Sequence, residues 1–251
     1  MRVGRIPYLN CEPFFHRLHE VQQGVELVDL IPRRLGQAMA AREIEAGPLS
    51  LMDYLRLETQ LTPLPYGIGC PTGARSVLLF SDRPLSALGG ARIGVTGETS
   101  TSVELLRVLL ALRYEVEPAA WVDAEAPSDA VLLIGDQAIR RLTGGPRARH
   151  TTDLGLDWRE WTGLPFVFAR WAVASRVPAG ERRAFERSLD LALDRGLEAL
   201  PAIAGVRRDL GWSAAQVESY LRNFAFRLGP DEEKGAAEFI RLRGQLGPIL
   251  C

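Results

Sequence analysis

The sequence predicts an α/β fold of two lobes with a ligand cleft between them. Short apolar runs alternate with segments in which apolar residues recur at helical spacing, and this alternation is typical of a largely parallel sheet covered by helices. The chain has 251 residues, of which 47% are hydrophobic and 24% charged, so it can bury the core of one large domain or of two small lobes.

The elements follow from hydrophobic period and length. Strands are expected at residues 2–6, 25–30, 49–51, 76–80, 92–95, 130–134 and 165–174. Helices are expected at residues 12–20, 33–45, 101–112, 136–142, 180–200, 213–224 and 231–245. The helix at 101–112 is apolar almost all round, so we expect it to be buried on several sides.

Three expected helices have start signals in the sequence. Thr101 with Glu104, and Ser213 with Gln216, have the spacing of a capping box. Pro230 precedes three acidic residues, which suits a first helical turn.

Two turn-rich segments, at residues 81–90 and 172–178, suggest where the chain passes between lobes. A chain that leaves a first lobe, builds a second and returns has a discontinuous first lobe. We therefore predict one lobe from residues 1–85 and 173–251, and the other from residues 86–172. Clefts between such lobes are preferred ligand sites.

Composition and motifs exclude several classes of protein. The net charge of −1 gives no overall field for nucleic acid or an anionic membrane, and no apolar run approaches the ~18 residues of a membrane span. Three widely spaced cysteines form no disulfide framework or CxxC metal site, and no nucleotide-binding, zinc-protease or serine-hydrolase motif occurs. Because the motifs of cofactor and metal sites are missing, we expect neither a cofactor nor a metal. Because the sequence has no signal-peptide pattern, we expect a cytoplasmic protein.

Two other reactive groups have structural alternatives. His16 and His19 lie three residues apart on an expected helix, where a solvated helix face is favoured over a metal pair. Cys11 could be a nucleophile, but no base is nearby in sequence, so a buried thiol in the core is favoured.

Small polar residues, all neutral except Asp136, lie where expected strands end and helices begin. They are Asn10, Ser50, Ser76, Thr99, Ser100, Thr101, Ser102 and Asp136, the last with Gly135 before it. Ligands of open α/β sheets bind at the carboxyl ends of strands, where helix N-termini offer free N–H groups to anions. This pattern predicts a site for a small anion.

Several of these residues also have structural interpretations. Thr101 could be a plain N-cap, Ser76 could simply begin a strand, and Asp136 could cap its helix or pair with Arg140. Asn10 is harder to explain by structure alone. Pro7 and Pro13 restrict the backbone around it, and an amide is a poor choice for core packing.

The segment RIPYLNCEPFF, residues 5–15, resembles the R-x-x-Y-L-N-x-x-P element of the chorismate dehydratase family, which acts first in the futalosine route to menaquinone. The similarity continues in AGPLSLMDYL, RSVLLFSDRPLSAL, TSTSVELLRVLL, VLLIGDQAI and DLGLDWREWTGLPFVFARW. These blocks are spread over residues 5–171, and the match is weaker in the C-terminal helices.

The resemblance implies a cytoplasmic enzyme with a type II periplasmic-binding-protein fold that dehydrates chorismate to 3-[(1-carboxyvinyl)oxy]benzoate. It implies no cofactor and no metal, a small dicarboxylate as the partner, and a monomer or homodimer. Asn10 and Ser76 would be catalytic and would hold a carboxylate or the leaving hydroxyl. The substrate-binding residues would be Ser50, Thr101, Ser102 and Asp136.

The choice among Thr99, Ser100, Thr101 and Ser102 stays open at this point. We expect the enolpyruvyl carboxylate of the substrate to take the ring proton, because no base is evident among the candidates. The alternatives are a non-catalytic small-anion binding protein of the same fold and an enzyme that uses Cys11 as its nucleophile.

Overall fold

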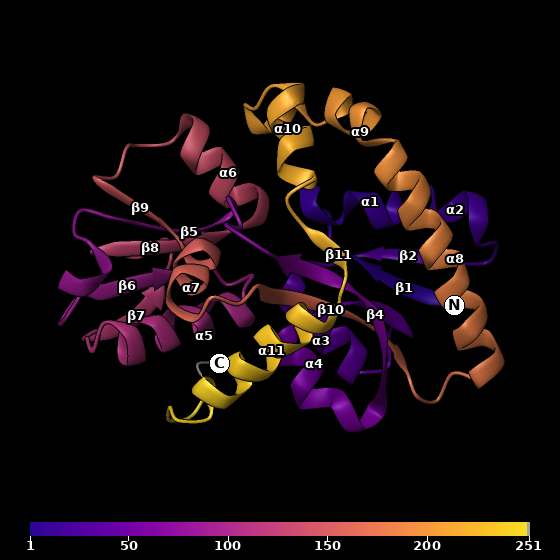
Figure 1. Ribbon diagram of the computed structural model, residues 1–251, viewed down its shortest axis with the longest axis horizontal. Coiled ribbons are helices and arrows are strands. Elements are labelled where there is room, and N and C mark those ends of the chain that lie inside the picture. Colours follow the sequence, from indigo (N-terminus) through magenta and orange to yellow (C-terminus); the bar gives the residue numbers. More distant parts are fainter. Residues whose placement is uncertain (250–251) are drawn as a thin grey trace.

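Two β-sheets, each covered by helices, make up the computed structural model, which describes residues 1–249 (Figure 1). The first sheet has six strands in the order β11-β4-β10-β3-β1-β2, and the second has five in the order β7-β6-β8-β5-β9. The first sheet consists of β1 (Arg2–Arg5), β2 (Glu26–Asp29), β3 (Ala46–Ser50), β4 (Leu61–Cys70), β10 (Phe166–Ala174) and β11 (Ala225–Arg227). The second sheet consists of β5 (Val77–Ser81), β6 (Arg92–Val95), β7 (Ala120–Asp123), β8 (Ala130–Ile134) and β9 (His150–Asp153). The two-lobed α/β fold class predicted from the sequence is confirmed.

Helices follow most of the strands. Those that accompany the first sheet are α1 (Glu12–Phe15), α2 (Leu18–Val21), α3 (Pro32–Ala40), α4 (Leu51–Leu57), α8 (Ala179–Glu198), α9 (Leu200–Val206), α10 (Ala214–Leu221) and α11 (Pro230–Arg243). Those of the second sheet are α5 (Thr101–Val108), α6 (Gly135–Gly144) and α7 (Leu154–Thr162). Helix α5 is buried on nearly every side, as predicted, because it packs against α4, α7, α11 and β10.

The chain passes between the sheets at residues 71–76, after β4, and at residues 163–165, before β10. Strand β5 therefore pairs in the second sheet and β10 in the first. The lobe boundaries expected from the sequence follow residues 85 and 172. Each lies several residues C-terminal to the point where the chain crosses between the sheets. The turn residues behind that prediction instead connect β5 to β6 and β10 to α8, because turn chemistry marks any connection, within a lobe as well as between lobes.

The sheets are mixed, where the sequence pattern suggested largely parallel ones. Strands β1, β2 and β3 are parallel, and so are β6, β7 and β8. Strand β10 is antiparallel to β3 and β4, and β5 is antiparallel to β8 and β9. The reason is the topology: both strands enter their sheet from the other lobe, so they run against the strands that end at the cleft.

Several elements differ from those predicted. The helix expected at 12–20 is split into α1 and α2, and the helix expected at 33–45 ends at Ala40, just before Arg42 with its positive φ of 62°. Strands β4, β7, β9 and β11 and helices α4, α7 and α9 were not predicted. Strand β4 contains Pro63 and Pro65, residues that usually argue against a strand, and its pairing with β10 has register shifts.

The capping predictions have mixed outcomes. Ser213 and Gln216 form the predicted capping box, and Pro230 begins α11 with acidic residues in its first turn. The box expected at Thr101 and Glu104 is wrong. The N-cap of α5 is Ser100, and the N–H of Ser102 is instead bound by the hydroxyl of Thr99, outside the helix.

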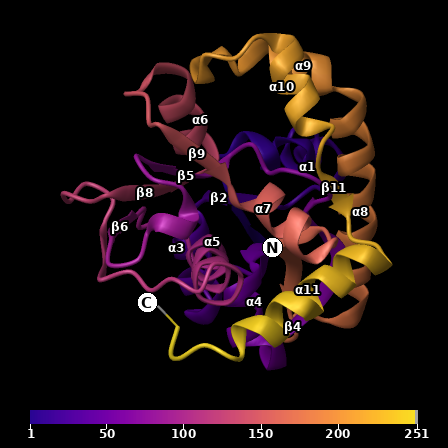
Figure 2. The same cartoon turned by 60° about the vertical axis from the view of Figure 1, so that its left-hand side comes forward.

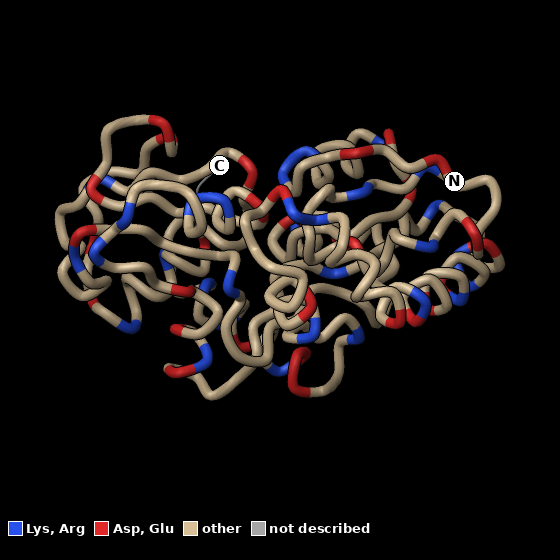
Figure 3. Tube along the Cα trace, turned by 90° about the horizontal axis from the view of Figure 1, so that it is seen from above, with Lys and Arg blue, Asp and Glu red and all other residues tan. Residues whose placement is uncertain are grey.

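Helix α11 lies across the junction of the lobes, where it packs against β10 of the first sheet and α5 of the second (Figure 2). There Arg243 forms an ion pair with Glu104, whose side chain is completely buried in α5. Charged residues of both signs are spread over the two lobes (Figure 3). No helix among residues 1–249 is long and apolar enough to cross a membrane.

Candidate active site

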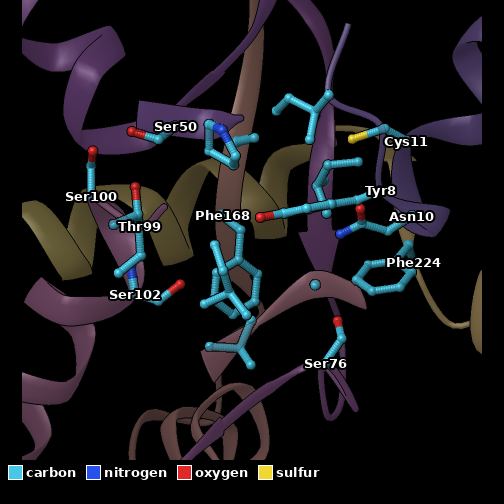
Figure 4. Close-up of a pocket in the computed structure, with 18 residues that line it drawn as sticks. Tyr8, Asn10, Cys11, Ser50, Ser76, Thr99, Ser100, Ser102, Phe168 and Phe224 are labelled. Carbon is cyan, nitrogen blue, oxygen red and sulfur yellow. The ribbon is translucent and has the colours of Figure 1, made fainter. Parts of the chain in front are cut away.

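A cavity lies between the two sheets, where β1, β3 and β8 of both lobes end (Figure 4). About 570 Å³ of space there, part of it open to solvent, is not filled by protein atoms. Its polar lining consists of Tyr8, Asn10, Ser50, Ser76, Thr99, Ser100, Thr101 and Ser102, with Cys11 beside them. Phe168 and Phe224 contribute aromatic surface, and no residue of the lining is charged.

Two polar walls face each other across this cavity. The Tyr8–Asn10 wall consists of those two residues, which follow β1 in the first lobe. The α5 wall consists of Ser50, Thr99, Ser100, Thr101 and Ser102, at the starts of α4 and α5. Figure 4 shows side chains of the two walls on opposite sides, with Phe168 between them.

In the Tyr8–Asn10 wall, two buried polar atoms have no partner. They are the hydroxyl of Tyr8 and Oδ1 of Asn10. A buried polar atom without a hydrogen bond costs about 1–3 kcal/mol in proteins, so a ligand or water that bonds to it is favoured. The polar atoms of this wall are therefore available to a ligand.

The hydroxyls of the α5 wall are largely used within the protein. Ser50 caps α4 by accepting from the N–H of Asp53 at 3.1 Å, and it donates to the carboxylate of the same residue at 2.6 Å. Thr101 accepts from the N–H of Met52 at 3.1 Å, which ties α5 of the second lobe to α4 of the first. Thr99 and Thr101 serve here only as acceptors, so this wall offers a ligand their hydroxyl protons beside the positive end of the α5 dipole.

Ser76 lies at the first crossing between the lobes and lines the cavity, as predicted. Its hydroxyl is 2.7 Å from that of Tyr220 and 3.3 Å from the carbonyl oxygen of Ala74. Complete burial holds the pKa of Tyr220 well above its usual range, so this phenol stays protonated and can donate to Ser76. The carbonyl oxygen of Ser76 accepts from the N–H of Gly135 at 2.7 Å.

Asp136 is the one predicted site residue that does not line the cavity. Its Oδ1 accepts from the N–H of Leu9 at 3.0 Å, and its Oδ2 forms an ion pair with Arg207. Arg140, a possible partner in the sequence, pairs with Asp209 instead. Asp136 thus joins α6 of the second lobe to the segment of the first lobe that presents Tyr8 and Asn10.

The thiol of Cys11 lines the cavity but is not set up as a nucleophile. Burial raises its pKa, and the negative charges of Glu12 and Asp136 add to the shift, so the thiolate is disfavoured. Among the described residues, no group of three or more His, Cys, Asp or Glu side chains could hold a metal ion, and His16 and His19 belong to none.

Tyr8, Phe168 and Phe224 were not predicted as site residues. Tyr8 stands two residues before Asn10 in the segment RIPYLNCEPFF, so its place at the end of the first strand was a usable signal. Phe168 lies inside a strand and Phe224 follows a helix. Nothing in the local sequence distinguishes these two rings from core aromatics.

Two α/β lobes around a cleft have the fold of the periplasmic binding proteins. Solved structures agree on this fold. One is a protein from Archaeoglobus fulgidus, with a TM-score of 0.78 and 18% identity, covering 97% of this chain and 96% of that one. Another is the alkanesulfonate-binding protein of Xanthomonas axonopodis pv. citri bound to MOPS, with a TM-score of 0.67 and 18% identity over 100% of this chain and 95% of that one.

The sequence comparisons are more specific. The family model for menaquinone biosynthesis matches residues 1–245, and the chain belongs to that family. A curated relative, the chorismate dehydratase of Thermus thermophilus, is 30% identical over 263 aligned positions, which cover 96% of this chain and 94% of the relative. The family resemblance noted in the sequence is therefore confirmed.

Proposed function

We propose that the protein is a chorismate dehydratase that forms 3-[(1-carboxyvinyl)oxy]benzoate and water on the futalosine route to menaquinone. The observation behind this proposal is a cavity without charged side chains in which Asn10 Oδ1 is buried and unpartnered. Chorismate as a dianion has several acceptors but one hydrogen-bond donor, its ring hydroxyl. An unpartnered acceptor in the Tyr8–Asn10 wall suits that donor.

The reaction removes the ring hydroxyl together with the hydrogen on the neighbouring carbon, which bears the enolpyruvyl ether. The electrons of that C–H bond form a new ring double bond as the C–O bond breaks, and the ring becomes aromatic. The driving force is intrinsic to the substrate, so the protein has to bind a dianion, orient it and stabilise the departing hydroxide.

The lining offers no carboxylate or imidazole as a general base. The enolpyruvyl carboxylate of the substrate therefore takes the ring proton. In such a mechanism the protein contributes orientation, which can supply up to ~7–11 kcal/mol of the barrier. Closure of the two lobes excludes water from the reacting groups.

The roles of the predicted residues follow from their contacts. The ring carboxylate binds at the α5 wall, near Ser102 and the positive end of the helix dipole. Asn10 accepts from the ring hydroxyl. Ser76 accepts from Tyr220 and turns its own proton from the long 3.3 Å bond with the Ala74 carbonyl oxygen to the substrate. Ser50, Thr101 and Asp136 act indirectly, because their side chains hold α4, α5 and Leu9 in place.

The proposed enzyme needs neither cofactor nor metal and works in the cytoplasm as a monomer or homodimer. The direct test is to incubate the purified protein with chorismate, with and without a chelator, and to separate the products by chromatography with mass detection. We expect a species lighter by one water that retains the enolpyruvyl group and forms equally fast with chelator. If turnover were lost only in the presence of the chelator, the proposal that the reaction needs no metal would be wrong.

The alternative is a small-anion binding protein without catalysis, and its supporting observation is the likeness to binding proteins of this fold, one of them bound to MOPS. Chorismate that is recovered unchanged while raising the melting temperature would favour this alternative. Chorismate that is neither converted nor bound would exclude the dehydratase function and would exclude chorismate as the anion that a binding protein takes.

A further inference from the structure

The hydroxyl of Tyr8 is a buried donor without a partner at the edge of the cavity. Tyr8 is 8% exposed, its side chain lines the cavity, and its oxygen makes no hydrogen bond within the protein. Figure 4 shows this hydroxyl pointing toward the middle of the cavity. No structural role for the oxygen is evident, since a phenylalanine would fill the same space without the cost of an unsatisfied polar atom.

The ring of Tyr8 is held in place by the second lobe. Gly135 begins α6 with a φ of +55°, and a Cβ built on it would lie 2.5 Å from Cδ2 of Tyr8. Beside this contact, the carboxylate of Asp136 accepts from the N–H of Leu9, the residue after Tyr8. These contacts of the second lobe fix the direction of the phenol, as expected for a group that must meet one atom of a ligand.

Dehydration requires a proton donor for the departing hydroxide, and the other polar residues of the cavity are poor donors. Hydroxide is a poor leaving group, so its departure is faster when a donor gives it a proton or a strong hydrogen bond. The Ser50 hydroxyl already donates to Asp53, and Asn10 Oδ1 can only accept. The Thr101 hydroxyl, which accepts from the N–H of Met52, is an alcohol and so a weak acid. A phenol is a stronger acid than water or an alcohol, and that of Tyr8 is uncommitted.

We propose that Tyr8 is a catalytic residue that donates its phenolic proton to the departing ring hydroxyl. This inference rests on the proposed chorismate dehydratase function. As the C–O bond breaks, its electron pair leaves with oxygen, which takes the Tyr8 proton and becomes water. The ring proton has passed to the enolpyruvyl carboxylate, and this carboxylic acid returns a proton to the Tyr8 phenolate. The cycle converts one dianion to another plus water, with no outside reagent.

The product offers a way to test which substrate atom Tyr8 meets. It keeps both carboxylates and the ether oxygen of chorismate but lacks the ring hydroxyl. If Tyr8 contacts that hydroxyl, Tyr8→Phe removes turnover and leaves product affinity unchanged. If Tyr8 instead anchors a carboxylate, product affinity falls together with turnover.

The experiment measures kcat, KM and product dissociation constant for wild type, Tyr8→Phe and Tyr114→Phe. Tyr114 is a matched control, because its hydroxyl donates to Asp157 at 2.7 Å, away from the cavity lining. We expect kcat of Tyr8→Phe to fall by about 10²–10³-fold, the usual effect of losing one donor to developing negative charge. Its product affinity and melting temperature should be preserved, and Tyr114→Phe should keep wild-type kcat.

Each outcome separates the two proposals. Turnover in the wild type with near-normal kcat in Tyr8→Phe would overturn the role of Tyr8 and leave the dehydratase function standing. A parallel loss of product affinity would also overturn it, in favour of a binding role. A wild type that does not convert chorismate would remove both the function and this inference.

Discussion

The two polar walls of the cavity differ in what they leave unsatisfied. In the Tyr8–Asn10 wall, a phenol oxygen and an amide oxygen are buried without partners. In the α5 wall, Ser50, Thr99 and Thr101 bind backbone N–H groups of the protein. Unsatisfied groups cost stability in the empty protein and are satisfied by a ligand, whereas satisfied hydroxyls stabilise the fold and shape the site. The rate of the chemical step should therefore depend on the Tyr8–Asn10 wall, whereas substrate affinity and protein stability should depend on the α5 wall.

The largest effect is expected from Asn10→Ala in the Tyr8–Asn10 wall. Loss of the acceptor that orients the ring hydroxyl should lower kcat by at least about 10²-fold, as for a misplaced reacting group, with a smaller change in KM. The protein should not be destabilised through lost hydrogen bonds, because Oδ1 makes none. Steady-state kinetics and a thermal melt measure both. A variant with near-normal kcat would remove Asn10 from the mechanism.

Gly135→Ala tests the same wall from the other lobe. The new methyl would collide with the Tyr8 ring, so we expect kcat to fall by about 10²-fold, as for a displacement of about 1 Å. The positive φ should also cost about 1–2 kcal/mol of unfolding free energy.

Gly163→Ala is the matched control for that substitution. Gly163 has a φ of +73° and no atom within 4 Å of its Cβ position, so it shares the backbone strain without the collision. Equal losses of kcat in both variants would show that strain, and not the position of Tyr8, limits turnover.

Thr101→Val tests the α5 wall and should have the opposite signature. The N–H of Met52 loses its acceptor, which should cost about 1–3 kcal/mol of unfolding free energy. We expect KM to rise more than kcat falls, because the connection between α4 and α5 shapes the binding surface. Denaturant unfolding and steady-state kinetics measure these quantities. Thr151→Val on the exposed strand β9 is the control and should change stability by no more than about 0.5 kcal/mol.

The smallest effect is expected from Cys11→Ala, although Cys11 also lines the cavity. Its pKa is raised by burial, so at neutral pH it is a thiol, and a nucleophilic role would require activity to increase as pH rises toward ionisation. We expect kcat close to that of wild type and no such increase. Inactivation by a thiol alkylating agent that chorismate prevents, together with an inactive Cys11→Ala, would restore the nucleophile alternative.

The sequence predicts those strands and helices that form from a short apolar run or an apolar helical segment. The parallel strands β1, β6 and β8 and the buried helix α5 were predicted, because each is a short apolar run or an apolar helical segment bounded by turn residues. Strand β4 could not be predicted, since its prolines argue against a strand and its main partner, β10, lies more than 90 positions later in the chain. Such long-range pairing leaves no local pattern.

For the site, too, some residues follow from the local sequence and others depend on contacts between distant parts of the chain. Asn10, Ser50, Ser76, Thr101 and Ser102 all line the cavity, because strand ends and helix starts meet at the edge of a sheet. The position of Asp136 behind the cavity depends on Arg207, which lies 71 residues later in the sequence. Whether a hydroxyl is free or already bonded, as in Tyr8 and Thr101, also depends on contacts between the lobes.

The ion pairs between the lobes affect how fast ligands can enter. Opening the cleft would separate Asp136 from Arg207 and the buried Glu104 from Arg243, and separating buried charges is costly. The open form should therefore be a small fraction of the population, and the observed association rate constant is the intrinsic one multiplied by that fraction. A ligand should therefore enter slowly and also leave slowly.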